Sequence, residues 1–177
     1  MSWILTRSGK HFDFADPQPD QVDIIDIAWG LAKECRFAGQ CMGFYSVAQH
    51  SVLVSEIVPA ELALEGLLHD ASEAYCKDIP MPLKAMLPDY KAIEQRVDRA
   101  IRAAFGLPEV CSPEIKRADI ILLATERRDL MPHDPAPWAI LEGVAPLPKQ
   151  VRPISIPEAL DWFMQNYIDL RAMAAVQ

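Results

Sequence analysis

The sequence lacks both a long apolar run and the pattern of a secretory leader. No stretch reaches the roughly 18 to 20 consecutive apolar residues that a membrane-spanning helix needs. Residues 1–10 show no basic start followed by an apolar segment, so we expect no secretory signal. Both absences favour a cytoplasmic protein that does not bind membranes.

Positive charge is also scarce. Lys and Arg total 17 against 25 Asp and Glu, which gives a formal net charge of −8. This balance argues against nonspecific binding to nucleic acid or anionic lipid, because both need a basic surface. It permits an anionic small molecule wherever a local positive group receives it. The four cysteines form no Cys-x-x-Cys pair, and we expect reduced thiols.

Strand patterning is confined to the first 14 residues, where segments 3–6 and 11–14 flank a Ser8-Gly9 turn and predict a small β-hairpin. The later patterning is helical, with apolar residues recurring every three to four positions. With 177 residues, 51% of them hydrophobic, the chain is expected to form one domain over residues 1–177. We therefore predict an all-α bundle of six or seven helices with a possible N-terminal hairpin.

Capping and breaking residues set approximate helix limits. Ser46 is a plausible N-cap, Ser112-Pro113 is typical of a helix start, Gly106 of a C-cap, and Ser155 with Glu158 of a capping box. Six prolines between residues 131 and 153 predict an irregular surface segment. The helices are expected over residues 24–35, 47–57, 61–75, 82–86, 89–105, 113–130 and from 156 onward, with Ala104 and Ala174 facing inward.

Polar residues interrupt three of the apolar stripes, at His50, at His69-Asp70 and at Asp119. A buried His or Asp is costly unless it is paired. A single inward His is more often a hydrogen-bonded core residue than a ligand. Two imidazoles and two carboxylates from three helices, however, suit a borderline divalent metal and leave an octahedral ion two positions for water and substrate. The second His-Asp pair, His133-Asp134, lies in the proline-rich segment and is expected to be exposed at the surface without a role in a site.

These four residues resemble the H…HD…D pattern of the HD-domain phosphohydrolase superfamily. Segments 68–73, 77–78 and 82–84, together with Arg36-Phe37, resemble bacterial HD-domain 5′-deoxynucleotidases. Segments 5–10 and 45–51 resemble small phage-type HD phosphohydrolases, which include dATP triphosphohydrolases. The resemblance covers roughly residues 3–130. It departs from the long-linker nucleotidases in the short spacing between His50 and His69.

The resemblance implies roles for individual residues. His50, His69, Asp70 and Asp119 are expected to hold a divalent transition metal such as Mn, Co, Zn or Fe. A second metal ion, Mg, is an additional option. Glu73 is expected to orient or deprotonate the attacking water. Its position four residues after His69 and three after Asp70 agrees with that role if the helix is continuous. The implied substrate-binding residues are Arg36, Asp78 and Lys84.

The function expected from these residues is removal of phosphate from the 5′ position of a deoxynucleotide, with a dATP-type substrate as the leading candidate. One alternative is hydrolysis of a signalling nucleotide. Another is a regulatory module that binds nucleotides without turnover. The expected partner is a small-molecule nucleotide, with homo-oligomer formation possible.

Overall fold

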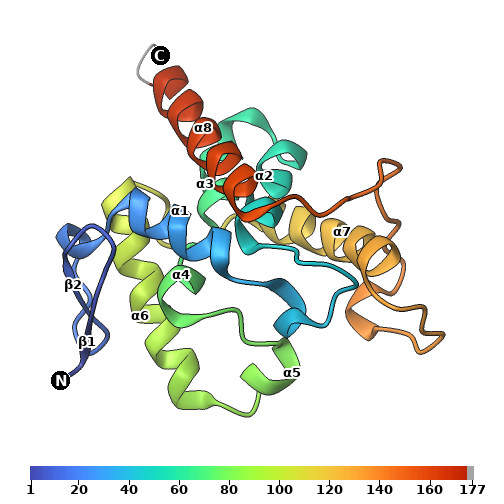
Figure 1. Ribbon diagram of the computed structural model, residues 1–177, viewed down its shortest axis with the longest axis horizontal. Helices are drawn as coiled ribbons and strands as arrows, with labels where there is room; N and C mark the ends of the chain where they lie inside the picture. Colours follow the sequence, from blue (N-terminus) through green and yellow to red (C-terminus); the bar gives the residue numbers. More distant parts are fainter. Residues whose placement is uncertain (175–177) are drawn as a thin grey trace.

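The computed structural model describes residues 1–174, which are mostly helical with a small antiparallel sheet at the N-terminus (Figure 1). This confirms the all-α class with an N-terminal hairpin. The strands are β1 (Trp3–Leu5) and β2 (His11–Asp13). The helices are α1 (Ile24–Lys33), α2 (Val47–Ile57), α3 (Ala63–Leu68), α4 (Glu73–Cys76), α5 (Met81–Lys84), α6 (Pro88–Phe105), α7 (Pro113–Leu130) and α8 (Ile156–Ala174), joined in places by the single 3-10 turns η1 (Pro19–Gln21), η2 (Arg36–Gly39), η3 (Ala60–Leu62) and η4 (Ala139–Leu141).

A buried aromatic side chain packs the hairpin against the helical body. Ile4 pairs with Phe12 across the two strands, and the connecting turn uses Gly9 at a φ of +84°. Phe12 is fully buried, and its ring stacks on Tyr75 of α4 with 4.0 Å between the ring centroids. The predicted hairpin therefore packs directly against the segment that follows the His69-Asp70 pair.

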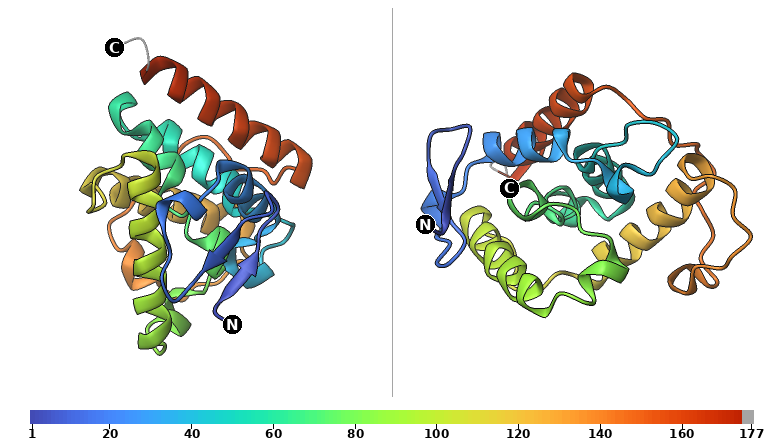
Figure 2. Two further views of the ribbon diagram at one scale, coloured as in Figure 1. Left: turned by 90° about the vertical axis from the view of Figure 1, so that its left-hand side faces the viewer. Right: turned by 60° about the horizontal axis from the view of Figure 1, so that its bottom comes forward.

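Helix α2 is the central element of the molecule. It packs against α1, α3, α7 and α8 (Figure 2). Most of its residues are buried. Its start is set by Ser46, whose hydroxyl oxygen accepts a hydrogen bond from the backbone N–H of Gln49, as predicted. Gly66 lets α3 approach closely, since a Cβ there would lie 3.1 Å from Cα of Ser55. His50 of α2 is consequently surrounded by helices and fully buried.

The single helix predicted over residues 61–75 is wrong, because it is interrupted at the His-Asp pair. Helix α3 ends at Leu68 and α4 begins at Glu73. In between, backbone amides bond to carbonyls three residues back, as from Glu73 N–H to the Asp70 carbonyl at 2.9 Å, which is the tighter 3-10 pattern. The break is accompanied by close packing of α4 on α1. Gly30 of α1 leaves room for Ala74 of α4, because a Cβ at position 30 would lie only 2.7 Å from the Cβ of Ala74.

Three smaller expectations also need correction. Ala104 and Ala174 are exposed, because α6 turns Ala100 and Ile101 inward instead and the end of α8 extends past the core. Ser112 precedes α7 as predicted, but its hydroxyl does not cap the helix. It donates instead to Oε2 of the buried Glu65 at 2.6 Å.

The proline-rich segment 131–153 is irregular, as its composition predicts, and contains only η4 within it. The end of α7 holds it in place. Arg127 donates to the carbonyls of Asp134 and Ala136, and Arg128 donates to the carbonyl of Leu147. Ser155 and Glu158 then form the predicted capping box of α8. Among the described residues, none of the helices has the length and apolar character needed to cross a membrane.

Candidate metal centre

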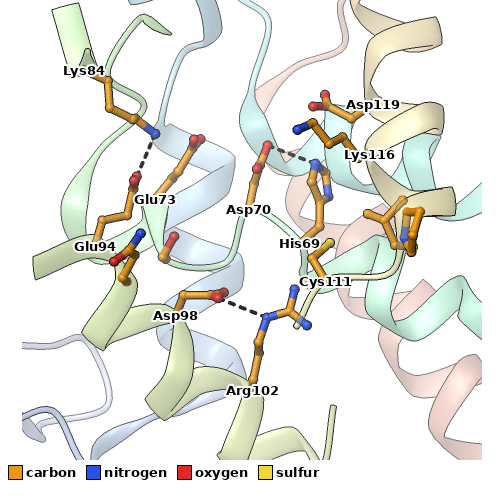
Figure 3. Close-up of a pocket in the computed structure, with 14 residues that line it drawn as sticks. His69, Asp70, Glu73, Lys84, Glu94, Asp98, Arg102, Cys111, Lys116 and Asp119 are labelled. Atoms are coloured by element: carbon orange, nitrogen blue, oxygen red, sulfur yellow. Dashed lines mark hydrogen bonds and ion pairs between the residues drawn. The ribbon is translucent and has the colours of Figure 1, made fainter. Parts of the chain in front are cut away.

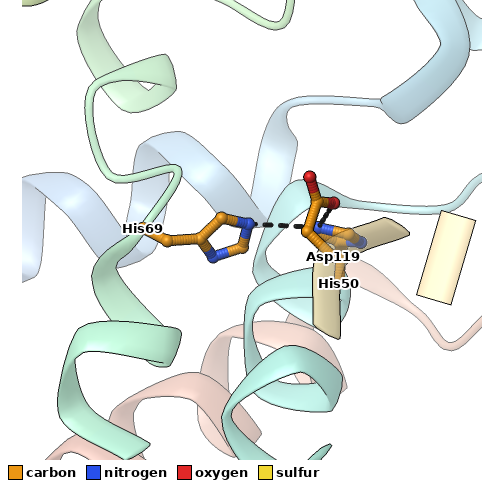
Figure 4. A group of neighbouring side chains, drawn as sticks. All are labelled: His50, His69 and Asp119. Atoms are coloured by element: carbon orange, nitrogen blue, oxygen red, sulfur yellow. Dashed lines mark hydrogen bonds and ion pairs between the residues drawn. The ribbon is translucent and has the colours of Figure 1, made fainter. Parts of the chain in front are cut away.

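Four side chains from three parts of the fold converge on one point. His50 comes from α2, His69 and Asp70 from the tight turn after α3, and Asp119 from the middle of α7. Nε2 of His50 lies 3.3 Å from Nε2 of His69 and 3.2 Å from Oδ1 of Asp119 (Figure 4). Oδ2 of Asp70 lies 3.5 Å and 3.2 Å from the same two nitrogens. All four residues singled out in the sequence thus meet.

Both imidazoles are held with Nε2 directed at this point. Nδ1 of His50 lies 2.6 Å from Oε1 of Glu126, and Nδ1 of His69 lies 2.8 Å from the carbonyl of Gly66. A carbonyl and an ionised carboxylate can only accept, so both Nδ1 atoms must donate. Each Nε2 is then the atom available to a metal, and the partner of Nδ1 fixes the orientation of the ring.

The spacing of these atoms fits a metal ion. Ligands about 2.1 Å from a common ion lie about 3.0 to 3.4 Å apart at octahedral and tetrahedral angles. The distances between the converging ligand atoms, 3.2 to 3.5 Å, fall in or beside that range. His50, His69 and Asp119 form a group whose ligand atoms all lie within 4.8 Å of one another. Two nitrogens and two carboxylate oxygens form the mixed set that suits a borderline divalent metal.

Glu126, which the sequence analysis missed, lies at the centre of the network behind the histidines. It is fully buried, and besides His50 it accepts from the hydroxyl of Tyr45 at 2.7 Å and from Nη2 of Arg36 at 3.2 Å. It lies seven residues after Asp119, hence on the same face of α7 two turns away. That helical spacing was the only signal in the sequence that could have identified it.

The charges of this network shift several pKa values. Burial opposes the ionisation of Glu126, but Arg36 and His50 outweigh it and lower the pKa of Glu126. Burial and Arg36 likewise oppose a charge on His50, yet Glu126 and Asp119 raise its pKa to about 9. Burial disfavours the ionised Asp70, and the neighbouring His69, His50 and Arg36 nevertheless hold its pKa well below the usual range. The carboxylates around the two Nε2 atoms therefore favour positive charge at this point, whether it is a proton on His50 or a bound cation.

Glu73 lies beside the four converging residues but is not hydrogen-bonded to them. It is 6% exposed, and its Oε2 atom is buried without a hydrogen-bond partner. Burial first, and then the carboxylates of Asp70 and Asp78, raise its pKa well above the ordinary value. A carboxyl group with a raised pKa and a free oxygen beside a candidate metal centre is typical of a general acid or base.

The three residues assigned to substrate are placed differently from one another. Arg36 is buried, and its guanidinium is paired with Glu126 and with Oδ2 of Asp70 at 3.4 Å. Lys84 lies near the site but is paired with Glu94 at 2.7 Å. Asp78 is half-buried at the rim of a cavity at the site. Burial raises its pKa, and the nearby Arg36, which acts in the opposite direction, does not cancel that effect.

Two cavities meet at the metal centre, and both are lined by Asp70, Glu73, Lys84 and Asp119. One, of about 490 Å³ and called the polar cavity here, is lined mainly by charged and polar residues, including Lys116, which extends from α7 beside Asp119 (Figure 3). The other, of about 560 Å³, is walled mainly by apolar and aromatic side chains, among them Phe37, Trp138 and Ile140. A substrate at the centre therefore has a polar side and an apolar side available to it.

Comparison with known proteins places the chain in a family. No family model matches it. The "Uncharacterized protein YfdR" of Escherichia coli (strain K12) is 51% identical over 171 residues, which is 96% of each chain. The "Uncharacterized protein RCAP_rcc00048" of Rhodobacter capsulatus is 39% identical over 127 residues, 66% of this chain and 65% of that one. The chain belongs to the YfdR family, and neither name states an activity.

Proposed function

We propose that this protein is a metal-dependent phosphohydrolase of the HD-domain type, which removes phosphate from the 5′ position of deoxynucleotides in the cytoplasm. One observation carries the proposal. Two histidines whose Nδ1 atoms are already engaged direct their Nε2 atoms at the carboxylates of Asp70 and Asp119, where two cavities meet. A buried core histidine needs no such convergence.

His50, His69, Asp70 and Asp119 are the residues that hold the divalent metal in this proposal. When bound, such a metal lowers the pKa of a coordinated water and neutralises charge on a phosphoryl oxygen. The local cation also accounts for an acidic protein accepting an anionic substrate. Glu126 and the Gly66 carbonyl hold the two imidazole rings in the required orientation.

The remaining residues act on water and substrate. Glu73 holds or accepts a proton at Oε2, the buried oxygen that has no partner. Arg36 positions Asp70 and Glu126 through its two ion pairs, so its assignment as a direct substrate ligand becomes secondary. Lys84 and Lys116 offer positive charge to the phosphate groups from the polar cavity. Asp78 offers its carboxylate to a sugar hydroxyl from the rim of the apolar cavity.

The proposal is tested by a panel of nucleotides assayed with Mn²⁺, Co²⁺, Zn²⁺, Fe²⁺ and Mg²⁺. Release of phosphate, pyrophosphate and tripolyphosphate is scored for each deoxynucleoside monophosphate and triphosphate, with ribonucleotides and signalling nucleotides alongside. We expect deoxynucleotide turnover that chelation abolishes and that Asp119→Ala removes. Tight nucleotide binding without turnover under every metal would contradict the enzyme and favour a regulatory module.

A further inference from the structure

The apolar cavity has one wall that the proposed chemistry leaves without a role. Phe37 comes from the turn η2 after α1, and Trp138 comes from the proline-rich segment just before η4, a hundred residues later. Their ring centroids are 6.3 Å apart and the rings are tilted by 49°. Both rings line the cavity that also contains Asp70, Glu73 and Asp119.

The backbone that presents Phe37 is strained. Phe37 and Ala38 both have positive φ angles, of 56° and 51°, and Gly39 follows at 74°. Residues with a Cβ rarely adopt this left-handed conformation, and such strain is found preferentially at functional sites. The turn is held by hydrogen bonds from Arg36 N–H to the Tyr45 carbonyl at 2.9 Å and from Gln40 N–H to the Phe37 carbonyl at 3.0 Å.

Trp138 is held from behind by α7. The guanidinium of Arg127 lies 4.9 Å from the centroid of the indole ring, and the same guanidinium donates to the carbonyls of Asp134 and Ala136. Leu141 N–H donates to the Trp138 carbonyl at 2.8 Å. An indole that is half-buried and supported by a cation in this way is a rigid surface facing the cavity.

We propose that Trp138, with Phe37 packed beside it, stacks on the planar base of a nucleotide whose 5′-phosphate lies at the metal centre. The inference rests on the proposed function and assigns its base-recognition element. The face of an aromatic ring accepts any flat heteroaromatic ring by stacking, whereas a bare sugar phosphate has no ring to place on it. The proline-rich segment, which contains Trp138, then makes the site selective for nucleotides over other phosphate esters.

Steady-state kinetics on two substrates tests the assignment. A deoxynucleoside 5′-monophosphate is compared with 2-deoxyribose 5-phosphate, which keeps the sugar and the phosphate but has no base. Stacking predicts a KM for the nucleotide about 10- to 100-fold below that of the sugar phosphate. Trp138→Ala should raise the nucleotide KM toward that of the sugar phosphate. It should leave kcat and KM for the sugar phosphate unchanged. Trp138→Phe should restore most of the difference.

Trp29 provides a matched control, because its indole also packs under a guanidinium, that of Arg7 at 3.7 Å, but lines neither cavity. Trp29→Ala should leave the ratio of the two KM values unchanged. A Trp138→Ala effect of equal size on both substrates, or none on either, would overturn the assignment while leaving the phosphohydrolase in place.

A binding measurement gives a readout that does not depend on turnover. With Trp3, Trp29 and Trp162 replaced by Phe, Trp138 is the remaining tryptophan of the chain. We expect its fluorescence to be quenched by the nucleotide in a Glu73→Gln background, in which turnover is slow, and to be unchanged by 2-deoxyribose 5-phosphate. Hydrolysis is measured in the same single-tryptophan protein with Glu73 retained and Mn²⁺ added. Quenching in the Glu73→Gln protein, together with no hydrolysis by the protein that retains Glu73, would support base stacking and contradict the enzyme. Hydrolysis of the nucleotide without any change in this emission would overturn the stacking role alone, and the absence of both would overturn both proposals.

Discussion

Nδ1 of His50 donates to Oε1 of Glu126 across 2.6 Å, which joins the central helix α2 to α7 at the back of the candidate metal centre. Both side chains are fully buried. The bond directs Nε2 of His50 toward Asp119, which lies two turns before Glu126 on the same helix. One helix thus supplies both a proposed ligand and the group that orients another ligand.

Glu126→Gln should weaken metal binding by about 10- to 100-fold, the usual effect of losing the partner that orients a metal-binding histidine. Metal affinity is measured by calorimetry on protein that circular dichroism shows to be folded. Glu114→Gln, an exposed site on the same helix, is the matched control. Wild-type affinity in folded Glu126→Gln would remove the orienting role. Glu126→Ala is less suitable, because it also removes one of the two carboxylate partners of the buried Arg36.

Glu73→Gln should retain metal and nucleotide binding but lose about 10²- to 10⁴-fold in turnover, as expected for a lost general acid or base. Glu61→Gln, at an exposed carboxylate, should be neutral. The variant should also alter the pH dependence of stability. The folded pKa of Glu73 is raised, so ionisation of this group costs stability increasingly as the pH rises above its unfolded value of about 4.3.

Denaturant unfolding in EDTA between pH 4 and 7 measures that second effect. The free energy of unfolding of Glu73→Gln should fall less with rising pH than that of the wild type. Parallel curves for the two proteins would show that the Glu73 carboxyl is not perturbed in the fold.

Asp78→Asn should reduce the preference for substrates that carry a 3′-hydroxyl. A half-buried carboxylate at the rim of the apolar cavity is left without a partner when that hydroxyl is missing. The measurement is the ratio of kcat/KM for a deoxynucleotide and its 2′,3′-dideoxy analogue. Asp89→Asn, at an exposed site, serves as the control. An unchanged ratio in Asp78→Asn would leave Asp78 with a role in the loop alone.

A buried ion pair, of which Arg102 lines the polar cavity, should make the free energy of unfolding depend on pH in the acid range. Oε1 of Glu65 lies 3.1 Å from Nη1 of Arg102, and both residues are more than nine-tenths buried. Burial opposes the charge of Glu65, but Ser112 and Arg102 lower its pKa. Its contribution is therefore present above its unfolded pKa of about 4.3 and is lost as the pH falls through the folded value.

Glu65→Ala should accordingly cost about 1 to 3 kcal/mol near pH 7. It removes one carboxylate partner of the buried Arg102 and leaves Asp98, 3.0 Å from its Nε, as the other. The difference from the wild type should shrink toward pH 3. Thermal unfolding followed across that range checks both statements. A difference that does not depend on pH would assign the loss to packing instead of charge.

The sequence was informative where a polar residue broke an apolar stripe. His50 and Asp119 were identified in that way, because helical spacing alone shows which face a residue shares. The role of Glu126 depends on Tyr45 and Arg36, which approach it only in the tertiary fold. Such contacts leave no local pattern in a single sequence.

Two features of the backbone, a left-handed turn and a helix interruption, were likewise not predicted from the sequence. The left-handed turn begins at Phe37 and Ala38, which carry no preference for positive φ, so nothing in the sequence predicted it. The interruption at His69-Asp70 was missed because the apolar period continues across it. Arg36 and Lys84 were assigned to substrate from the resemblance, and their carboxylate partners Glu126 and Glu94 became visible only in the structure.

Equilibrium metal binding tests the central claim most directly. Metal-depleted protein is titrated with Mn²⁺, Co²⁺ and Zn²⁺, comparing the wild type with His50→Ala, His69→Ala and Asp119→Ala. The matched control is His133→Ala, which removes an exposed histidine from the second His-Asp pair of the chain. Because binding must displace the proton of a His50 ring whose pKa is raised to about 9, affinity should increase as the pH rises toward that value. The account predicts a saturable site that His133→Ala keeps and the other three variants lose; equal binding by all five proteins would contradict it.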